Sequence, residues 1–199
     1  MYEYFLAALA FGLSAGLQPG PLSVIILHQT LTRGLPAGLR ACLAPLVTDG
    51  PIILVTTLAL PHLESLAGFT TFLNLAGGLY LLVIARSMFF SSVHPVHGAA
   101  APLTGSLGTA IRINLLNPNP YLFWFTVGGG TILRGSHAQA VVFIATAITT
   151  LIATKMGVAL LASRCQPLLS DRIHQRVMRS LAASLALFGL LAMARAFPA

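Results

Sequence analysis

Two short stretches decide the fold of this chain: Leu17-Gln18-Pro19-Gly20-Pro21 and Leu116-Asn117-Pro118-Asn119-Pro120. Each lies inside a long apolar run. In a helix, its prolines lack an amide donor and leave carbonyl groups of the preceding turn without partners. If these runs cross a bilayer, such backbone is tolerated only where protein or a water-filled cavity satisfies it. The two proline clusters therefore mark the predicted pathway through the protein.

The composition around these clusters is that of a membrane protein. Of 199 residues, 56% are hydrophobic and only 8% are charged, against roughly 25% charged in a soluble domain. Long apolar runs separated by short polar breaks indicate helices and not a barrel. The net charge of +7 comes mostly from residues in short loops, which is a signal of membrane topology and needs no nucleic-acid partner. We predict an all-α integral membrane protein.

Charged and turn-forming residues divide the chain into six predicted transmembrane helices, the first and fourth broken at the proline clusters. Their approximate ranges are Tyr4–Thr32, Ala41–Leu60, Ser65–Ile84, Ile113–Leu133, Ala138–Ala162 and residues 180–194. The last is short, so the arginines at its ends would snorkel. The basic stretch before it, Ser163–Arg179, either lies on anionic headgroups or forms a solvated loop or helix end.

Lysine and arginine residues are unevenly shared between the two predicted sides. The side reached after the first, third and fifth helices carries Arg33, Arg40, Arg86, Arg112, Arg164, Arg172, Arg176 and Arg179, and the other side carries Arg134 and Arg195. For a multi-pass protein, the positive-inside bias predicts that both termini lie outside the cytoplasm.

The two halves of the chain share a pattern. Residues 1–90 and 107–199 each contain three predicted helices, joined by a small and polar cytoplasmic linker at residues 91–106. In each half the first helix carries Leu-[Gln/Asn]-Pro-x-Pro, and the second carries a deeply placed charge, Asp49 or Lys155. A duplicated unit with an odd number of spans enters the membrane in opposite orientations. The pattern therefore predicts an inverted repeat with a binding site at the broken helices.

These residues resemble the LysE/RhtB family of small amino-acid exporters. The resemblance rests on Gln18-Pro19-Gly20-Pro21, the basic turn Arg33–Arg40, Asp49 and Asn117-Pro118-x-Pro120-x-Leu122-Phe123, and it covers essentially the whole chain. It implies a cytoplasmic-membrane protein that exports amino acids or related metabolites, driven by the proton gradient. Asn119 stands where the family commonly has lysine, and Thr48-Asp49 replaces the more usual Gly-Asp, which leaves the substrate open.

Ten residues form the predicted substrate and ion pathway. They are Gln18, Pro19, Gly20, Pro21, Asp49, Asn117, Pro118, Asn119, Pro120 and Lys155. A charge at the centre of a spanning helix costs about 2.5 to 3.5 kcal/mol on insertion scales, so such residues face a cavity or each other. If the surroundings of Asp49 change between inward-open and outward-open states, its proton affinity changes too and couples protons to transport.

The predicted pathway suits a zwitterion. An amino-acid carboxylate could meet Lys155 and the amide-rich start of a helix after a proline break, while the ammonium meets Asp49 and the freed carbonyls. The amides of Gln18, Asn117 and Asn119 add neutral hydrogen-bonding groups. The alternative is that the two charges form a permanent structural ion pair and the prolines only kink helices for packing.

Other motifs say less about the function of the protein. His94 and His97 lie in the linker, and their spacing alone does not make a metal site. Tyr121, Phe123 and Trp124 could line a cavity or equally contact lipid or a neighbouring helix. No catalytic or nucleotide-binding motif is present, so neither an enzyme nor a cofactor is predicted.

The expected partners are a small-molecule solute, protons, membrane lipid and, in a homo-oligomer, further copies of the chain. Two other functions stay open at the level of sequence. A passive channel or metal-cation exporter would lack proton coupling or would need more acidic and sulfur ligands. A membrane scaffold would depend on Asp49 for assembly and have no transport to lose.

Overall fold

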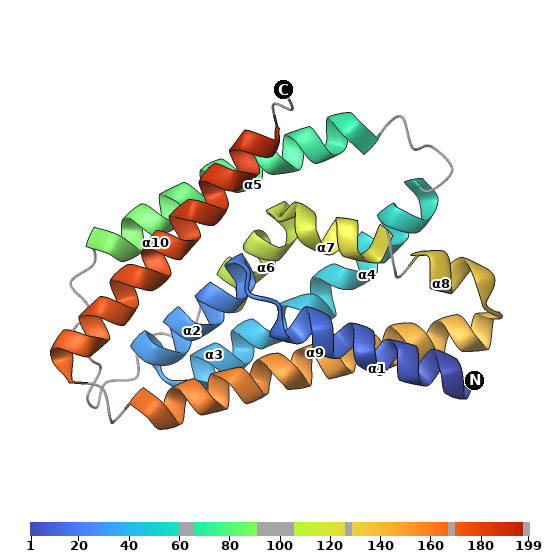
Figure 1. Cartoon of the computed structure of the whole chain (residues 1–199), viewed down its shortest axis with the longest axis horizontal. Coiled ribbons are helices and arrows are strands. Elements are labelled where there is room, and N and C mark those ends of the chain that lie inside the picture. Colours follow the sequence, from blue (N-terminus) through green and yellow to red (C-terminus); the bar gives the residue numbers. More distant parts are fainter. Residues whose placement is uncertain (60–65, 91–105, 126–128, 167–169, 197–199) are drawn as a thin grey trace.

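The structure of the chain is a computed structural model (Figure 1). It describes residues 1–59, 66–90, 106–125, 129–166 and 170–196. All regular secondary structure in these ranges is helical. Residues 91–105 of the predicted linker, with His94 and His97, lie outside the described ranges.

Ten helices are described, in chain order. Their bounds are α1 Tyr2–Leu17, α2 Pro21–Arg33, α3 Leu35–Cys42, α4 Ala44–Ala59, α5 Leu66–Phe90, α6 Ser106–Leu116, α7 Pro118–Phe123, α8 Gly129–Arg134, α9 His137–Cys165 and α10 Asp171–Arg195.

Helices end and restart at both proline clusters. α1 stops at Leu17 and α2 begins at Pro21, with a bend of 62° between them. α6 stops at Leu116 and α7 begins at Pro118, where the Asn117 side chain accepts a hydrogen bond from the Asn119 amide. In each case a proline occupies the first helical position, where a backbone N–H would have no helical partner anyway. The breaks therefore lie where the sequence predicts them.

Length and composition identify several helices that could cross a membrane. Within the described ranges, three qualify: Leu35–Thr56, His137–Cys165 and Arg172–Arg195. The bent pair of α1 and α2 makes a fourth if it is counted as one span, and Asn74–Phe90 is a shorter apolar helix. The full set of six spans and their inverted-repeat relation stay a prediction.

Two helices begin earlier than expected. α10 starts at Asp171 and continues through Arg172, Arg176 and Arg179, because arginine has a high helix propensity. The predicted short sixth span, residues 180–194, is therefore the C-terminal part of a 25-residue helix. The expected basic turn from Arg33 to Arg40 reduces to a tight connection at Gly34, whose φ of 84° favours glycine. α3 begins directly after it and contains Arg40.

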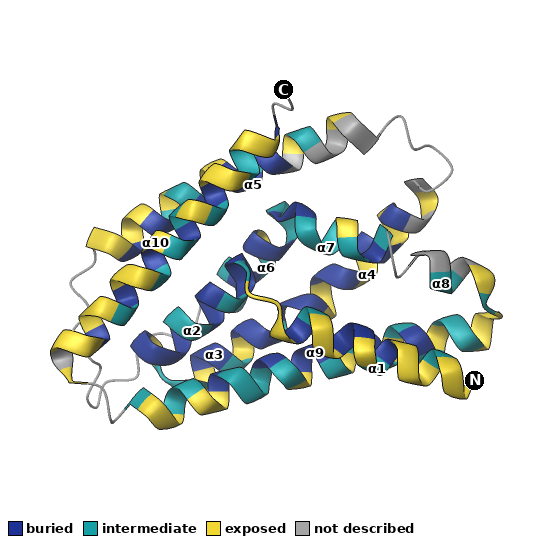
Figure 2. Cartoon of the chain, viewed as in Figure 1, coloured by how far each residue is buried: buried dark blue, intermediate teal, exposed yellow. Residues whose placement is uncertain are grey.

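The long helices form two outer pairs. α5 packs along α10 on one side and α1 packs along α9 on the other, with α2, α3, α4, α6 and α7 between them (Figure 1). Many residues on the outward faces of the pairs are exposed, whereas buried residues concentrate inside (Figure 2). These exposed faces carry large apolar side chains such as Val83, Leu161 and Leu187. Lipid tails would cover such a surface.

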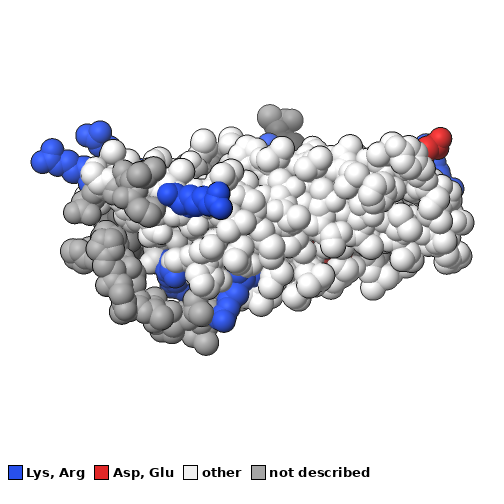
Figure 3. Space-filling model, turned by 90° about the horizontal axis from the view of Figure 1, so that it is seen from below, with Lys and Arg blue, Asp and Glu red and all other residues white. Residues whose placement is uncertain are grey.

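The charged residues are unevenly placed along the long axis. Seen from below, most visible Lys and Arg side chains lie toward one end, and the broad middle of the face is uncharged (Figure 3). An uncharged band between charged ends is the surface expected of a protein that crosses a bilayer.

The contact between α5 and α10 gives a first prediction. A methyl group on Gly189 would lie 2.8 Å from the Gly78 carbonyl oxygen, whereas one on Gly157 would meet nothing within 4 Å. Gly189→Ala should therefore push the two helices apart and destabilise the protein by about 1–3 kcal/mol. Gly157→Ala should be neutral or stabilising by up to about 1 kcal/mol. Thermal unfolding of both purified variants in detergent measures the difference. Equal midpoints would contradict the close packing.

Candidate functional site

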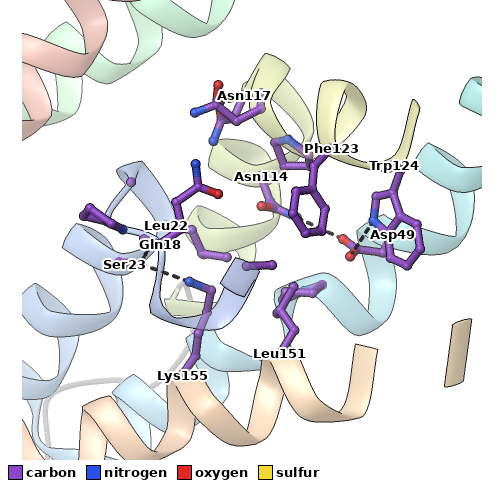
Figure 4. A pocket seen from close by; sticks show the side chains of 16 residues that line it. Gln18, Leu22, Ser23, Asp49, Asn114, Asn117, Phe123, Trp124, Leu151 and Lys155 are labelled. Atoms are coloured by element: carbon purple, nitrogen blue, oxygen red, sulfur yellow. Dashed lines mark hydrogen bonds between the residues drawn. The ribbon is translucent and has the colours of Figure 1, made fainter. Parts of the chain in front are cut away.

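A small cavity lies between the two broken helices (Figure 4). Its volume is about 70 Å³, enough for several water molecules. Among its lining residues are Gln18, Pro19, Gly20, Asp49, Asn117, Asn119, Pro120 and Lys155. The remaining two predicted residues, Pro21 and Pro118, are the buried first residues of α2 and α7 and do not line the cavity. The structure thus brings together predicted residues from both halves of the chain.

Lys155 reaches the cavity from the middle of α9. Its side chain is only 6% exposed. Its Nζ donates hydrogen bonds to the Gly16 carbonyl oxygen at 3.3 Å and to Ser23 Oγ at 3.0 Å. Gly16 lies in the last turn of α1, where carbonyl groups lack helical partners and a cation is favourable. The break in the first helix therefore creates the place where the lysine is held.

Asp49 reaches the cavity from α4 and is only 2% exposed. Its Oδ2 accepts a hydrogen bond from Trp124 Nε1 at 3.0 Å. Its Oδ1 accepts from Asn114 Nδ2 at 3.3 Å and from Thr48 Oγ1 at 3.2 Å. Asn114 Nδ2 also lies 2.6 Å from Thr48 Oγ1. Donors from α4, from α6 and from the end of α7 thus satisfy a carboxylate that would be costly to bury alone.

The two charges bind crosswise between the halves of the chain. Asp49, in the first half, is held by Asn114 and Trp124 of the second, and Lys155, in the second half, is held by Gly16 and Ser23 of the first. No ion pair joins these two described side chains, which lie at opposite ends of the pocket in Figure 4. In this conformation, Asp49 and Lys155 therefore do not form the ion pair that was the structural alternative.

Several site residues carried no clear signal in the sequence. Ser23 and Asn114 are ordinary polar residues on helices, and only their distance of two residues from a proline cluster could have pointed to them. Of the aromatic residues after the second cluster, Phe123 and Trp124 line the cavity. Tyr121 instead donates its hydroxyl to the Leu115 carbonyl oxygen at 3.0 Å.

The free bonding capacity of the site suits a solute with two opposite charges. A lysine ammonium has three donors, and two are used within the protein, which leaves one for a ligand. The Asp49 carboxylate likewise has more lone-pair sites than its bonds to Trp124, Asn114 and Thr48 occupy. Within the described ranges, no group of three or more His, Cys, Asp or Glu residues could hold a metal ion.

A comparison with protein families now adds a second line of evidence. The model of the family described as LysE type translocator matches residues 13–195 of the chain. The chain belongs to this family. Comparison with curated proteins and with solved structures gives no match.

Membership in the LysE type translocator family agrees with the all-helical fold and its apolar helices. Translocators move solutes across membranes, so the protein is a membrane transporter and takes a small-molecule substrate. The match begins at residue 13, before the first proline cluster, and ends in α10. It therefore covers every residue that lines the cavity.

Proposed function

We propose that this LysE translocator exports small amino acids, or closely related zwitterionic metabolites, across the cytoplasmic membrane by proton-coupled alternating access. The observation that carries the proposal is the pair of buried opposite charges, Asp49 and Lys155. They line one cavity without pairing with each other. Buried charges in a membrane protein are costly, and a shared cavity between broken helices is where transporters hold their solutes.

In the proposed complex, the carboxylate of the solute lies against Lys155 and the start of α2. Gly20 is the N-cap of that helix and Pro21 its first residue, so the amides of the first turn lack helical acceptors. Their partial positive charge adds to that of the lysine. The ammonium of the solute lies toward Asp49. The side chains of Gln18, Asn117 and Asn119 line the cavity and supply neutral hydrogen bonds.

The volume of the cavity favours a small solute. At about 70 Å³, it is well below the roughly 300–1,000 Å³ of typical drug-sized ligand sites. An amino acid with a short side chain needs less rearrangement to enter it than one with a long side chain. We therefore place the smallest amino acids first among the candidate substrates.

Two core clusters border the cavity, one through Trp124 and the other through Leu22. One core cluster consists of Ala8, Phe11, Ile52, Ile53, Trp124, Phe143 and Ala147. The other consists of Leu22, Ile26, Ala41, Cys42, Ala44, Ala110 and Ala159. In the proposed cycle each cluster opens in turn. Asp49 carries a proton across in one direction of the cycle, and in the other direction the solute ammonium takes the place of that proton.

The proposal is tested by counterflow in proteoliposomes that contain the purified protein. The vesicles are loaded in turn with glycine, alanine, serine, leucine, an amino-acid carboxamide, a simple amine and a divalent cation. Preferential exchange of small zwitterions supports the proposal. Exchange of the divalent cation alone would indicate a metal exporter, flux without saturation would indicate a channel, and no flux from folded protein would favour a scaffold.

A further inference from the structure

Trp124 occupies a special position beside the site. It is the single tryptophan of the chain, is 1% exposed, and follows directly after α7, where Trp124 and Phe125 form a π-helical turn. Such turns occur frequently at functional sites. Its indole Nε1 donates to Asp49 Oδ2 at 3.0 Å, so the ring is tied to the proposed proton site.

The ring also belongs to a group of four aromatic side chains, which we call the aromatic plug: Phe11, Phe123, Trp124 and Phe143. Phe11 of α1 lies at its centre. The ring centroid of Phe11 is 3.8 Å from that of Phe123, 5.1 Å from that of Trp124 and 5.4 Å from that of Phe143. The plug therefore joins α1, α7 and α9.

The aromatic plug lies at one end of the cavity. Phe123 and Trp124 line the cavity directly. Phe11 precedes the break of the first helix, and Phe143 lies three turns before Lys155 on α9. Both long helices thus place the plug on the side of the cavity nearer the N-terminus of α1. In the predicted orientation this is the side away from the cytoplasm.

We infer that Trp124 is a latch that keeps this end closed while Asp49 is charged and empty. The inference rests on the proposed function and deepens it. A hydrogen bond to an ionised acceptor is roughly twice as strong as one to a neutral group. A proton on Asp49, or a solute ammonium beside it, weakens the hold on the indole and lets the plug open.

The surroundings of Asp49 leave few other groups that could set the latch. The charged side chain that lines the same cavity is Lys155 of α9, and the thiol of Cys42 on α3 lies near that lysine. The groups contributed from α4 and α6, Thr48 and Asn114, are neutral hydrogen-bond partners. Among the described residues, Trp124 is therefore the one aromatic side chain whose hydrogen bond depends directly on whether Asp49 is charged.

A latch of this kind would prevent leakage. A proton-coupled exporter must not change conformation when it carries neither proton nor solute. If the empty protein could return after releasing a proton, it would move protons across the membrane without exporting solute, and the proton gradient would dissipate. With Asp49 charged and empty, the bond to Trp124 is at its strongest and the aromatic plug stays closed. With Asp49 protonated or paired to a solute, the bond is weaker and the end can open.

The single tryptophan makes the latch measurable without any transport assay. The full chain is purified in detergent, and quenching of its tryptophan fluorescence by acrylamide reports how accessible the Trp124 ring is to a small polar molecule in solution. The variants are Asp49→Leu, which removes the acceptor, and Asp49→Asn, which keeps an acceptor oxygen but no charge. Lys155→Met removes the other cavity charge and leaves the tryptophan bond intact.

The wild type and Lys155→Met should be protected from quenching, and Asp49→Leu should be quenched strongly. The population of molecules with an open aromatic plug should rise about tenfold, the factor that corresponds to the loss of one hydrogen bond to a charged group. Asp49→Asn should lie between, and it serves alone if Asp49→Leu does not fold. Equal protection in the wild type and both Asp49 variants would overturn the latch. Quenching of Lys155→Met as strong as that of Asp49→Leu would also overturn it. Either result leaves the counterflow test of the proposed function unaffected.

Discussion

Asp49→Asn should lower transport driven by a pH gradient by about 100-fold, the scale of removing one partner from a buried charge pair. Asparagine has the same shape and still accepts a bond from Trp124 through its amide oxygen, so the variant should fold. It cannot carry a proton, and it offers no charge to the solute ammonium. Downhill exchange should fall less than gradient-driven efflux, because the neutral contacts of the cavity persist. Initial rates in proteoliposomes, with and without the gradient, measure both effects.

Glu3→Gln is the matched control for this experiment. Glu3 is an exposed acid in the first turn of α1, far along the chain from the cavity. Its loss removes the same charge from the protein without touching the site, so transport should stay at the wild-type rate. Wild-type transport by Asp49→Asn would refute the assignment of Asp49, whatever the substrate.

Lys155→Met should lower the transport of amino acids by a similar factor of about 100. Methionine keeps much of the apolar stem of lysine but offers no cation to a carboxylate. It also leaves the Gly16 carbonyl and Ser23 without the donor that binds both in the wild type. The selectivity should change as well. The wild type should prefer an amino acid to its carboxamide, which keeps the ammonium but lacks the carboxylate, and the variant should lose this preference.

Competition in counterflow measures this preference. The amino acid and its carboxamide compete for uptake against one labelled substrate, with Arg164→Met as control. Arg164 is an exposed cation nine residues further along the same helix, α9. An unchanged preference in Lys155→Met would show that the solute carboxylate binds elsewhere.

The breaks in the helices could be predicted from sequence, because proline acts locally. A proline has no amide wherever the helix lies, and the positions of Pro21 and Pro118 at helix starts follow from that chemistry alone. The choice of Asp49 and Lys155 also needed only the cost of a charge in hydrocarbon. That both line one cavity agrees with this reasoning.

The partners of the two charges could not be predicted, because they depend on how the helices are rotated against each other. Trp124 lies 75 residues from Asp49 and Gly16 lies 139 residues from Lys155. The sequence left open whether the two charges face a cavity or each other, whereas the structure ties each one to the broken helix of the other half. The sequence also left open whether residues 163–179 form a loop or a helix end. In the structure, the part of this stretch from Asp171 onward belongs to α10.

The crosswise binding has a mechanical consequence for the proposed cycle. Because Asp49 holds the second broken helix and Lys155 holds the first, a solute that engages both charges contacts both halves of the chain at once. Loading the cavity would then bias both halves together, which is what a coupled transporter requires.

In the proposed mechanism, solute export and proton movement are obligatorily linked at this site. The most direct test imposes an amino-acid gradient alone across proteoliposomes, with no pH gradient, and records the internal pH with a trapped dye. Outward flow of the amino acid should drive protons inward through the wild-type protein and not through Asp49→Asn. Amino-acid efflux from the wild type with no change in internal pH would contradict this mechanism.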